Sequence, residues 1–278
     1  MEQSFFKTAG AVETNARMRW IPDESGEYKP YELLCFSRPV FVPDGWERVG
    51  MKQKKSVVDD LITDAEAVGN PAENRRKSYT RAKNKLFDLL MCTTSFDSFV
   101  TLTLSGNSVN RYDYKEIVGK LGVWLDNRVR RNDLTYALVP ELHKDGAIHF
   151  HGLVNMDGLK VERARYQNSG RLIYDSCKRP IFNVSDFPYG FSTCVPLSGD
   201  NARQATAKYC YKYITKSHGE KVGGRYYLSG GNLGRPRYTY LNVDFDALDE
   251  PIVKVGGGAA MVKKRRYNSS QEGVSMSI

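Results

Sequence analysis

The order of apolar and polar positions predicts alternating strands and helices through the middle of the chain. The segment Phe99-Val100-Thr101-Leu102-Thr103-Leu104 is dominated by β-branched and apolar residues, which predicts a buried strand. The same reasoning predicts strands over residues 134–142, 148–154, 182–184, 192–195, 226–228 and 237–243. Helical spacing of apolar residues predicts helices over residues 72–91, 113–131 and 202–217. These elements favour an α+β or α/β domain over residues 71–246.

The two ends of the chain differ from this middle part. In residues 1–70, prolines interrupt short apolar runs, and we expect an irregular or short-stranded accessory region that ends at Asn70-Pro71. From residue 247 on, a glycine run and the basic cluster Lys263-Lys264-Arg265-Arg266 predict a flexible tail. The expected organisation is an accessory region at 1–70, a main domain at 71–246 and a tail at 247–278.

Composition narrows the class of protein. The chain has 278 residues, of which 41% are hydrophobic, and this excludes disordered and collagen-like classes. No apolar run approaches the ~18 residues that span a bilayer, so we expect no membrane partner. A net charge of +9 favours a polyanion such as nucleic acid. The five cysteines are odd in number and include no CxxC pair, so we expect a reduced, cytoplasmic compartment.

Three of the four histidines lie close together in the sequence, at positions 143, 149 and 151. Alternate residues of a strand share a face, so His149 and His151 point the same way. Asp145-Gly146 between them and His143 is a turn signal. The segment therefore predicts a β-hairpin with imidazoles on one face.

The length of the hairpin loop decides which other side chains share that face. A two-residue loop would send the carboxylate of Glu141 to the opposite face. A three-residue loop, residues 145–147, pairs His143 with His149 and Glu141 with His151, so that all four candidate ligands lie together. Two imidazoles and a carboxylate with open positions suit a catalytic divalent cation, and a histidine-rich hairpin without metal is the alternative. Glu141 and His143 both stay candidates for the third ligand, with Glu141 preferred because a hard cation favours oxygen.

Two stripes of residues interleave in the helix predicted at 202–217. One is apolar and consists of Ala207, Cys210, Tyr211 and Ile214. The other carries phenols and ammonium groups and consists of Tyr209, Lys212, Tyr213 and Lys216. A phenol is a weak nucleophile at neutral pH, and a nearby lysine stabilises both the phenolate and the charge of a pentacovalent phosphate. The second stripe therefore predicts nucleophilic chemistry, whereas tyrosines that only cover surface are the alternative.

Together these segments resemble the HUH endonuclease superfamily of rolling-circle replication initiators from phages and plasmids. Residues 99–104 are similar to its first strand motif, His149-Phe150-His151 to its His-hydrophobic-His motif, and residues 209–216 to its tyrosine motif. The three occur in the expected order. The two tyrosines four residues apart are similar to the two-tyrosine members from small single-stranded-DNA phages.

The resemblance implies an α+β fold in which a central antiparallel sheet carries the His-x-His metal hairpin, with flanking helices and the tyrosine helix packed beside the sheet. It implies that Mg²⁺ or Mn²⁺, held by His149, His151 and Glu141 or His143, polarises the scissile phosphate of single-stranded DNA at a replication origin. A tyrosine then attacks phosphorus and leaves a 5′-phosphotyrosine link and a free 3′-OH. Tyr209-x-x-Lys212 and Tyr213-x-x-Lys216 both fit the motif, so the first nucleophile stays open.

Partners and DNA contacts are predicted less directly. The chain contains no Walker A segment, so unwinding and synthesis are expected to come from a helicase and a polymerase of a bacterial host, in its cytoplasm. The basic residues that we expect to hold phosphates are Arg203, Lys208, Arg225, Arg235 and Arg237. A relaxase or transposase with the same chemistry is an alternative. The alternative of another class is a non-enzymatic DNA-binding module with a structural metal.

Overall fold

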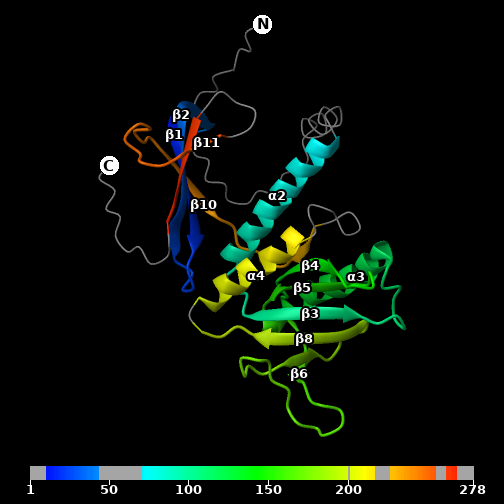
Figure 1. Ribbon diagram of the computed structural model, residues 1–278. Helices are drawn as coiled ribbons and strands as arrows, with labels where there is room; N and C mark the ends of the chain where they lie inside the picture. Colours follow the sequence, from blue (N-terminus) through cyan, green and yellow to red (C-terminus); the bar gives the residue numbers. More distant parts are fainter. Residues whose placement is uncertain (1–10, 44–70, 200, 217–225, 255–260, 268–278) are drawn as a thin grey trace. The chain divides into compact units, whose positions relative to one another are not determined.

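The structure, a computed structural model, describes residues 11–43, 71–199, 201–216, 226–254 and 261–267 (Figure 1). These residues form three α-helices and two antiparallel β-sheets, which confirms the α+β class. The chain divides into two compact units, Met1–Lys54 with Pro236–Ile278 and Lys55–Arg235. Among the described residues, no helix combines the length and apolar character needed to cross a membrane.

The larger unit is built on a seven-stranded sheet. In spatial order, its strands are β6 (Val161–Arg163), β7 (Phe182–Val184), β8 (Gly190–Pro196), β3 (Ser98–Leu104), β5 (Ile148–Val154), β4 (Tyr136–Leu142) and β9 (Leu228–Gly230). The histidine strand β5 pairs on one side with β3 and on the other with β4, antiparallel in both cases. The histidine hairpin therefore lies inside the sheet, where neighbouring strands hold its backbone on both sides.

Helix α3 (Tyr114–Asn132) supplies the main core of this unit. It begins after Asp113, whose side chain accepts hydrogen bonds from two backbone N–H groups of the first turn and so caps the helix. Its apolar stripe, which includes Ile117 and Leu121, lies in one buried cluster with Leu102 and Phe150 of the sheet. Because strand side chains alternate, burial of Phe150 against α3 turns its neighbours in β5 to the opposite face.

Helices α4 (Ala202–Lys216) and α2 (Pro71–Cys92) pack against each other, and α4 contacts β4 and β5 (Figure 1). Ala207 and Cys210 of α4 are fully buried. The ring of Tyr211 meets Phe87 of α2 edge-on, with centroids 5.5 Å apart. The tyrosine helix is therefore packed beside the central sheet, as the resemblance implied, and Tyr211 belongs to the packed side.

The smaller unit is a five-stranded antiparallel sheet. In spatial order, its strands are β10 (Arg237–Leu241), β1 (Ala11–Pro22), β2 (Tyr28–Pro43), β12 (Met261–Arg266) and β11 (Ile252–Lys254). Alternate residues of β1 and β2, among them Met18 and Leu33, form a buried cluster with Leu248 and Tyr267. The sheet thus joins the two ends of the chain around one core.

Three expectations about the ends of the chain differ from this structure. Residues 11–43 form two long strands, where we expected irregular or short-stranded structure. The basic cluster Lys263–Arg266, which we expected in a flexible tail, lies in β12 and pairs with β2. The strand at 237–241 was expected to close the main domain, but it pairs with β1 of the smaller unit. The physical reason is that the apolar faces of β1 and β2 need a partner, which the residues after 236 provide.

Candidate metal centre and tyrosine helix

The hairpin of β4 and β5 has a longer loop than we predicted. Glu141 lies opposite His149, whereas the three-residue loop would have paired it with His151. The loop spans residues 143–147: the N–H of His143 donates to the carbonyl of Ala147 at 2.8 Å, and Asp145 accepts from the N–H of Ala147 at 3.0 Å. The side chain of Asp145 thus satisfies backbone inside the turn and stabilises this wider loop. The register differs by two residues, so Glu141 stays on the face of the histidines.

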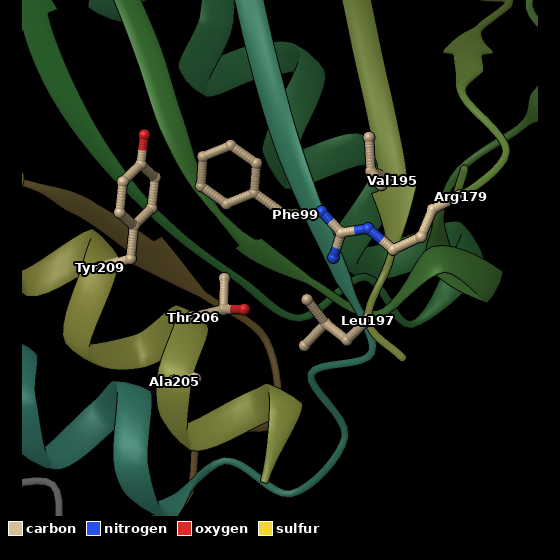
Figure 2. Close-up of a pocket in the computed structure, with 7 residues that line it drawn as sticks. All are labelled: Phe99, Arg179, Val195, Leu197, Ala205, Thr206 and Tyr209. Atoms are coloured by element: carbon tan, nitrogen blue, oxygen red, sulfur yellow. The ribbon is translucent and has the colours of Figure 1, made fainter. Parts of the chain in front are cut away.

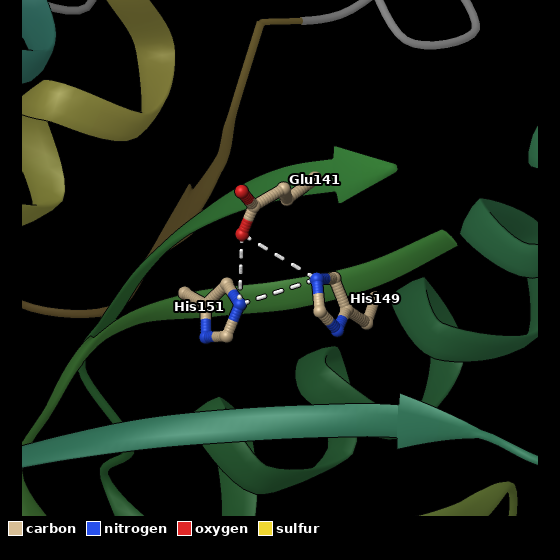
Figure 3. Close-up of side chains that lie close together, drawn as sticks. All are labelled: Glu141, His149 and His151. Atoms are coloured by element: carbon tan, nitrogen blue, oxygen red, sulfur yellow. Dashed lines mark hydrogen bonds and ion pairs between the residues drawn. The ribbon is translucent and has the colours of Figure 1, made fainter. Parts of the chain in front are cut away.

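Glu141, His149 and His151 converge on one point of that face (Figure 3). The Oε2 atom of Glu141 lies 3.1 Å from Nε2 of His151 and 3.4 Å from Nε2 of His149. The two Nε2 atoms are 3.3 Å apart. All three side chains are largely but not fully buried, with 25% of the Glu141 side chain exposed. The group therefore combines fixed positions with an opening to solvent.

These spacings fit a divalent cation. For metal–ligand bonds of about 2.1 Å, neighbouring ligand atoms are about 3.0 Å apart in an octahedron and about 3.4 Å apart in a tetrahedron. The three measured separations lie between 3.1 and 3.4 Å. The three atoms thus match one triangular face of a coordination shell, and a cation held there keeps its other positions for water or substrate oxygen.

Two residues of β3 hold the ring of His151 in place. The hydroxyl oxygen of Thr101 lies 2.9 Å from Nδ1 of His151, on the side of the ring away from Glu141. An Nδ1–H that donates to this hydroxyl leaves the Nε2 lone pair directed at the carboxylate and at His149. Phe99 stacks on the same imidazole, with ring centroids 5.9 Å apart and planes at 12°. Strand β3 therefore acts as a backing for the candidate metal ligands.

His143 lies beside this group but is not part of it. Its ring is exposed in the loop and packs against the ring of His149 at a centroid distance of 3.9 Å. Among the described residues, the group with ligand atoms within 4.8 Å of one another consists of Glu141, His149 and His151. The geometry thus favours Glu141 over His143 as the third ligand, in agreement with our preference for a carboxylate.

Helix α4 brings Tyr209 next to the ring that backs His151. The ring of Tyr209 meets Phe99 edge-on, with centroids 5.7 Å apart, and 49% of the tyrosine is exposed. Lys212 is also exposed, one turn further along the helix. The backbone of α4 continues through Tyr213 and Lys216, whose side chains lie outside the described part of the structure. One candidate nucleophile and the three candidate ligands thus contact or flank the same face of β3 and β5.

The structure gives two of the expected DNA contacts very different surroundings, although both lie on α4. Arg203 is 4% exposed, and its guanidinium donates to the carbonyl of Met91 at 2.7 Å. This placement argues against our expectation that Arg203 holds a phosphate, because its charge is used to join α4 to α2. Lys208, by contrast, is exposed.

The other three expected DNA contacts lie away from the hairpin in the sequence. Arg235 is exposed at the end of the larger unit. Arg237 belongs to the smaller unit, where its guanidinium lies 3.9 Å from the ring centroid of Tyr28. Arg225 lies outside the described residues. None of these placements tests a role in DNA binding.

Sequence reasoning missed Phe99, Thr101 and Arg179 as residues of the site. Phe99 and Thr101 were recognised only as parts of a strand, although their alternation along β3 puts both on the face that meets the histidines. The pairing of β3 with β5 was the missing information. Arg179, which lines a pocket beside Tyr209, gave no signal because it follows an irregular loop.

Comparison with known proteins gives one match. A family of replication-associated proteins, described as Replication-associated protein ORF2, matches residues 97–218, a range that includes β3, the histidine hairpin and α4. No curated protein and no solved structure matches the chain. The matched range is less than half of the 278 residues, and it supports a role as a replication initiator.

Proposed function

We propose that this chain is a metal-dependent endonuclease and strand transferase that cuts single-stranded DNA at a replication origin. One observation carries the proposal: the ring of Phe99 lies against both His151 of the candidate metal centre and Tyr209 of α4. A phosphate bound to the cation would therefore lie beside an exposed phenol. The similarity of residues 97–218 to a replication-associated family supports the same conclusion.

The chemistry assigns a separate task to each part of the site. A cation bound by Glu141, His149 and His151 supplies a Lewis acid for an oxygen of the scissile phosphate. The chain's own residues orient that phosphate, and the Tyr209 hydroxyl gives up its proton and attacks phosphorus. The new bond joins the tyrosine oxygen to phosphorus, the bond from phosphorus to the 3′ oxygen breaks, and the 3′ oxygen takes up a proton. The ammonium of Lys212 lies one turn away on α4, where it would balance charge on the phosphate.

The products suit the initiation of replication. The free 3′-OH primes synthesis, and the phosphotyrosine link conserves the energy of the broken phosphodiester for later joining. A second tyrosine on the same helix, Tyr213, would take over the new strand end when a round finishes. We propose that Tyr209 and Tyr213 exchange these roles, with helicase and polymerase supplied by the host.

The test is formation of a covalent adduct that survives a denaturing gel. The full chain is incubated with Mg²⁺ or Mn²⁺ and labelled single-stranded oligonucleotides that contain a randomised segment. We expect an adduct with the unaltered chain and none with the double variant Tyr209→Phe/Tyr213→Phe, which should still bind DNA. Tyr211→Phe is the matched control, because Tyr211 packs on α2. Adducts at unchanged yield in the double variant, or binding without any adduct in the unaltered chain, would contradict the proposal; the latter result favours the non-enzymatic DNA-binding module.

A further inference from the structure

A pocket opens beside Tyr209, on the side where β8 and the β6–β7 region meet α4 (Figure 2). Its volume is about 410 Å³, within the usual range for small-molecule sites. Phe99, Val195 and Leu197 give it apolar and aromatic walls, and Arg179 is the charged residue in its lining. The ring of Tyr209 forms one edge, so whatever fills the pocket lies directly beside the candidate nucleophile.

The guanidinium of Arg179 is fixed in its orientation by Asp175. Both Nε and one terminal nitrogen of Arg179 lie 2.7 Å from Oδ2 of Asp175. The other oxygen of Asp175 accepts from the backbone N–H groups of Cys177 at 2.9 Å and of Arg179 at 2.8 Å. One carboxylate thus holds the loop and the arginine side chain together, and the guanidinium points into the pocket (Figure 2).

The chemistry of this pair favours a flat, uncharged ligand. Asp175 balances the charge of Arg179, so the pair attracts a phosphate less than an unpaired arginine would. The planar face and the remaining N–H donors of the guanidinium still suit stacking on a nucleobase and hydrogen bonding to its edge. Apolar walls with one planar cation are what single-stranded nucleic-acid sites use to hold bases.

We propose that this pocket binds one unpaired nucleobase of the DNA strand, from a nucleotide next to the bond that Tyr209 attacks, with Arg179 stacked on the base or bonded to its edge. The inference rests on the proposed function and adds a residue that positions the strand and contributes sequence preference. Because the pocket and the nucleophile share Tyr209, the bound base fixes which phosphate faces the metal centre.

The test combines base removal with substitution of Arg179. A single-stranded oligonucleotide is selected from a randomised library by its binding to the full chain, and variants with one abasic site at each position are titrated by fluorescence anisotropy. With the unaltered chain, we expect one position at which loss of the base weakens binding by roughly tenfold. In Arg179→Leu, loss of the same base should change binding less than twofold, because the partner of the base is already absent. Arg179→Lys should behave like Arg179→Leu, since an ammonium keeps the charge but not the plane.

Arg171→Gln is the matched control, an exposed arginine of the same loop region, and should keep the profile of the unaltered chain. Thermal melting of each variant checks that the fold is retained. The same abasic profile in Arg179→Leu and the unaltered chain would overturn the inference, as would an Arg179→Lys variant that matches the unaltered chain or a chain that binds no oligonucleotide. Failure of the proposed function has another readout, the absence of a covalent adduct with the selected oligonucleotide.

Discussion

Phe99 lies face to face with His151, with the two ring planes at 12° and their centroids 5.9 Å apart. The opposite relationship holds with Tyr209, which meets the same phenyl ring edge-on at 5.7 Å. One side chain of β3 therefore sets the spacing between the candidate metal centre and the candidate nucleophile. This relationship joins two motifs that lie more than fifty residues apart in the sequence.

Replacement of Phe99 should impair strand cutting more than metal binding. Phe99→Ala removes the ring that spaces Tyr209 from His151, and a misplaced nucleophile reacts slowly, so we expect adduct formation to slow by roughly tenfold to a hundredfold. Mn²⁺ affinity, measured by calorimetry, should change less than threefold. Phe191→Ala on the adjacent strand is the control, because Phe191 is 58% exposed. Equal adduct rates in the two variants would show that Phe99 has no spacing role.

Thr101 should tune the metal centre through His151. Thr101→Val keeps the shape of the side chain but removes the hydroxyl that lies 2.9 Å from Nδ1 of His151. Partners of this kind are worth about 10-fold to 100-fold in metal affinity or activity, and we expect a loss of Mn²⁺ affinity in that range. Thr101→Ser keeps the hydroxyl and should retain most of the affinity. A valine variant that binds Mn²⁺ like the serine variant contradicts this role.

The third metal ligand can be identified by a matched pair of variants. Glu141→Gln removes the charge that lies 3.1 Å from Nε2 of His151, and we expect Mn²⁺ affinity to fall by at least about tenfold. His143→Ala should change the affinity less than threefold, because His143 lies outside the three-residue group. Calorimetric titration with Mn²⁺ measures both. The opposite order of effects would assign the third position to His143.

Thiol reactivity tests the burial of the cysteines and its pH dependence. Burial raises the pKa of Cys194 to about 11 and that of Cys210 to about 12, and it also raises the pKa of Cys35. A raised thiol pKa means that the unreactive protonated form persists through pH 8 to 9. Cys92 is buried as well, whereas Cys177 is exposed. We therefore expect a disulfide reagent at pH 8 to modify one thiol per native chain, and none in Cys177→Ser; rapid modification of a second thiol contradicts the structure.

The candidate site shows which features a sequence pattern can supply. Strand alternation alone placed His149 and His151 together, and it kept Glu141 on their face although the predicted loop was wrong. Loop length depends on side-chain bonds within the turn, such as that of Asp145 to the N–H of Ala147 at 3.0 Å, and these are not visible as periodicity. Phe99 and Thr101 required the pairing of β3 with β5, a long-range contact.

The smaller unit shows where local patterns mislead. The prolines suggested irregular structure, but Pro30 lies opposite Trp20 at a register shift, and the pairing of β2 with β12 covers only Glu32–Phe36. A proline is tolerated at such positions because no ladder hydrogen bond from its nitrogen is required. Strand β10 was found by its pattern, yet its partner β1 lies over two hundred residues away, and local periodicity carries no information about that choice.

The central claim is that the cation held by the hairpin and a tyrosine of α4 act on the same phosphate. Sulfur in place of a nonbridging oxygen of the scissile phosphate tests this directly, because sulfur binds Mg²⁺ poorly and softer cations better. The account predicts that sulfur strongly slows adduct formation in Mg²⁺, that Mn²⁺ restores much of the rate, and that mass spectrometry places the DNA on Tyr209 or Tyr213. Equal rates with oxygen and sulfur in Mg²⁺, or an adduct on a residue outside α4, would contradict it.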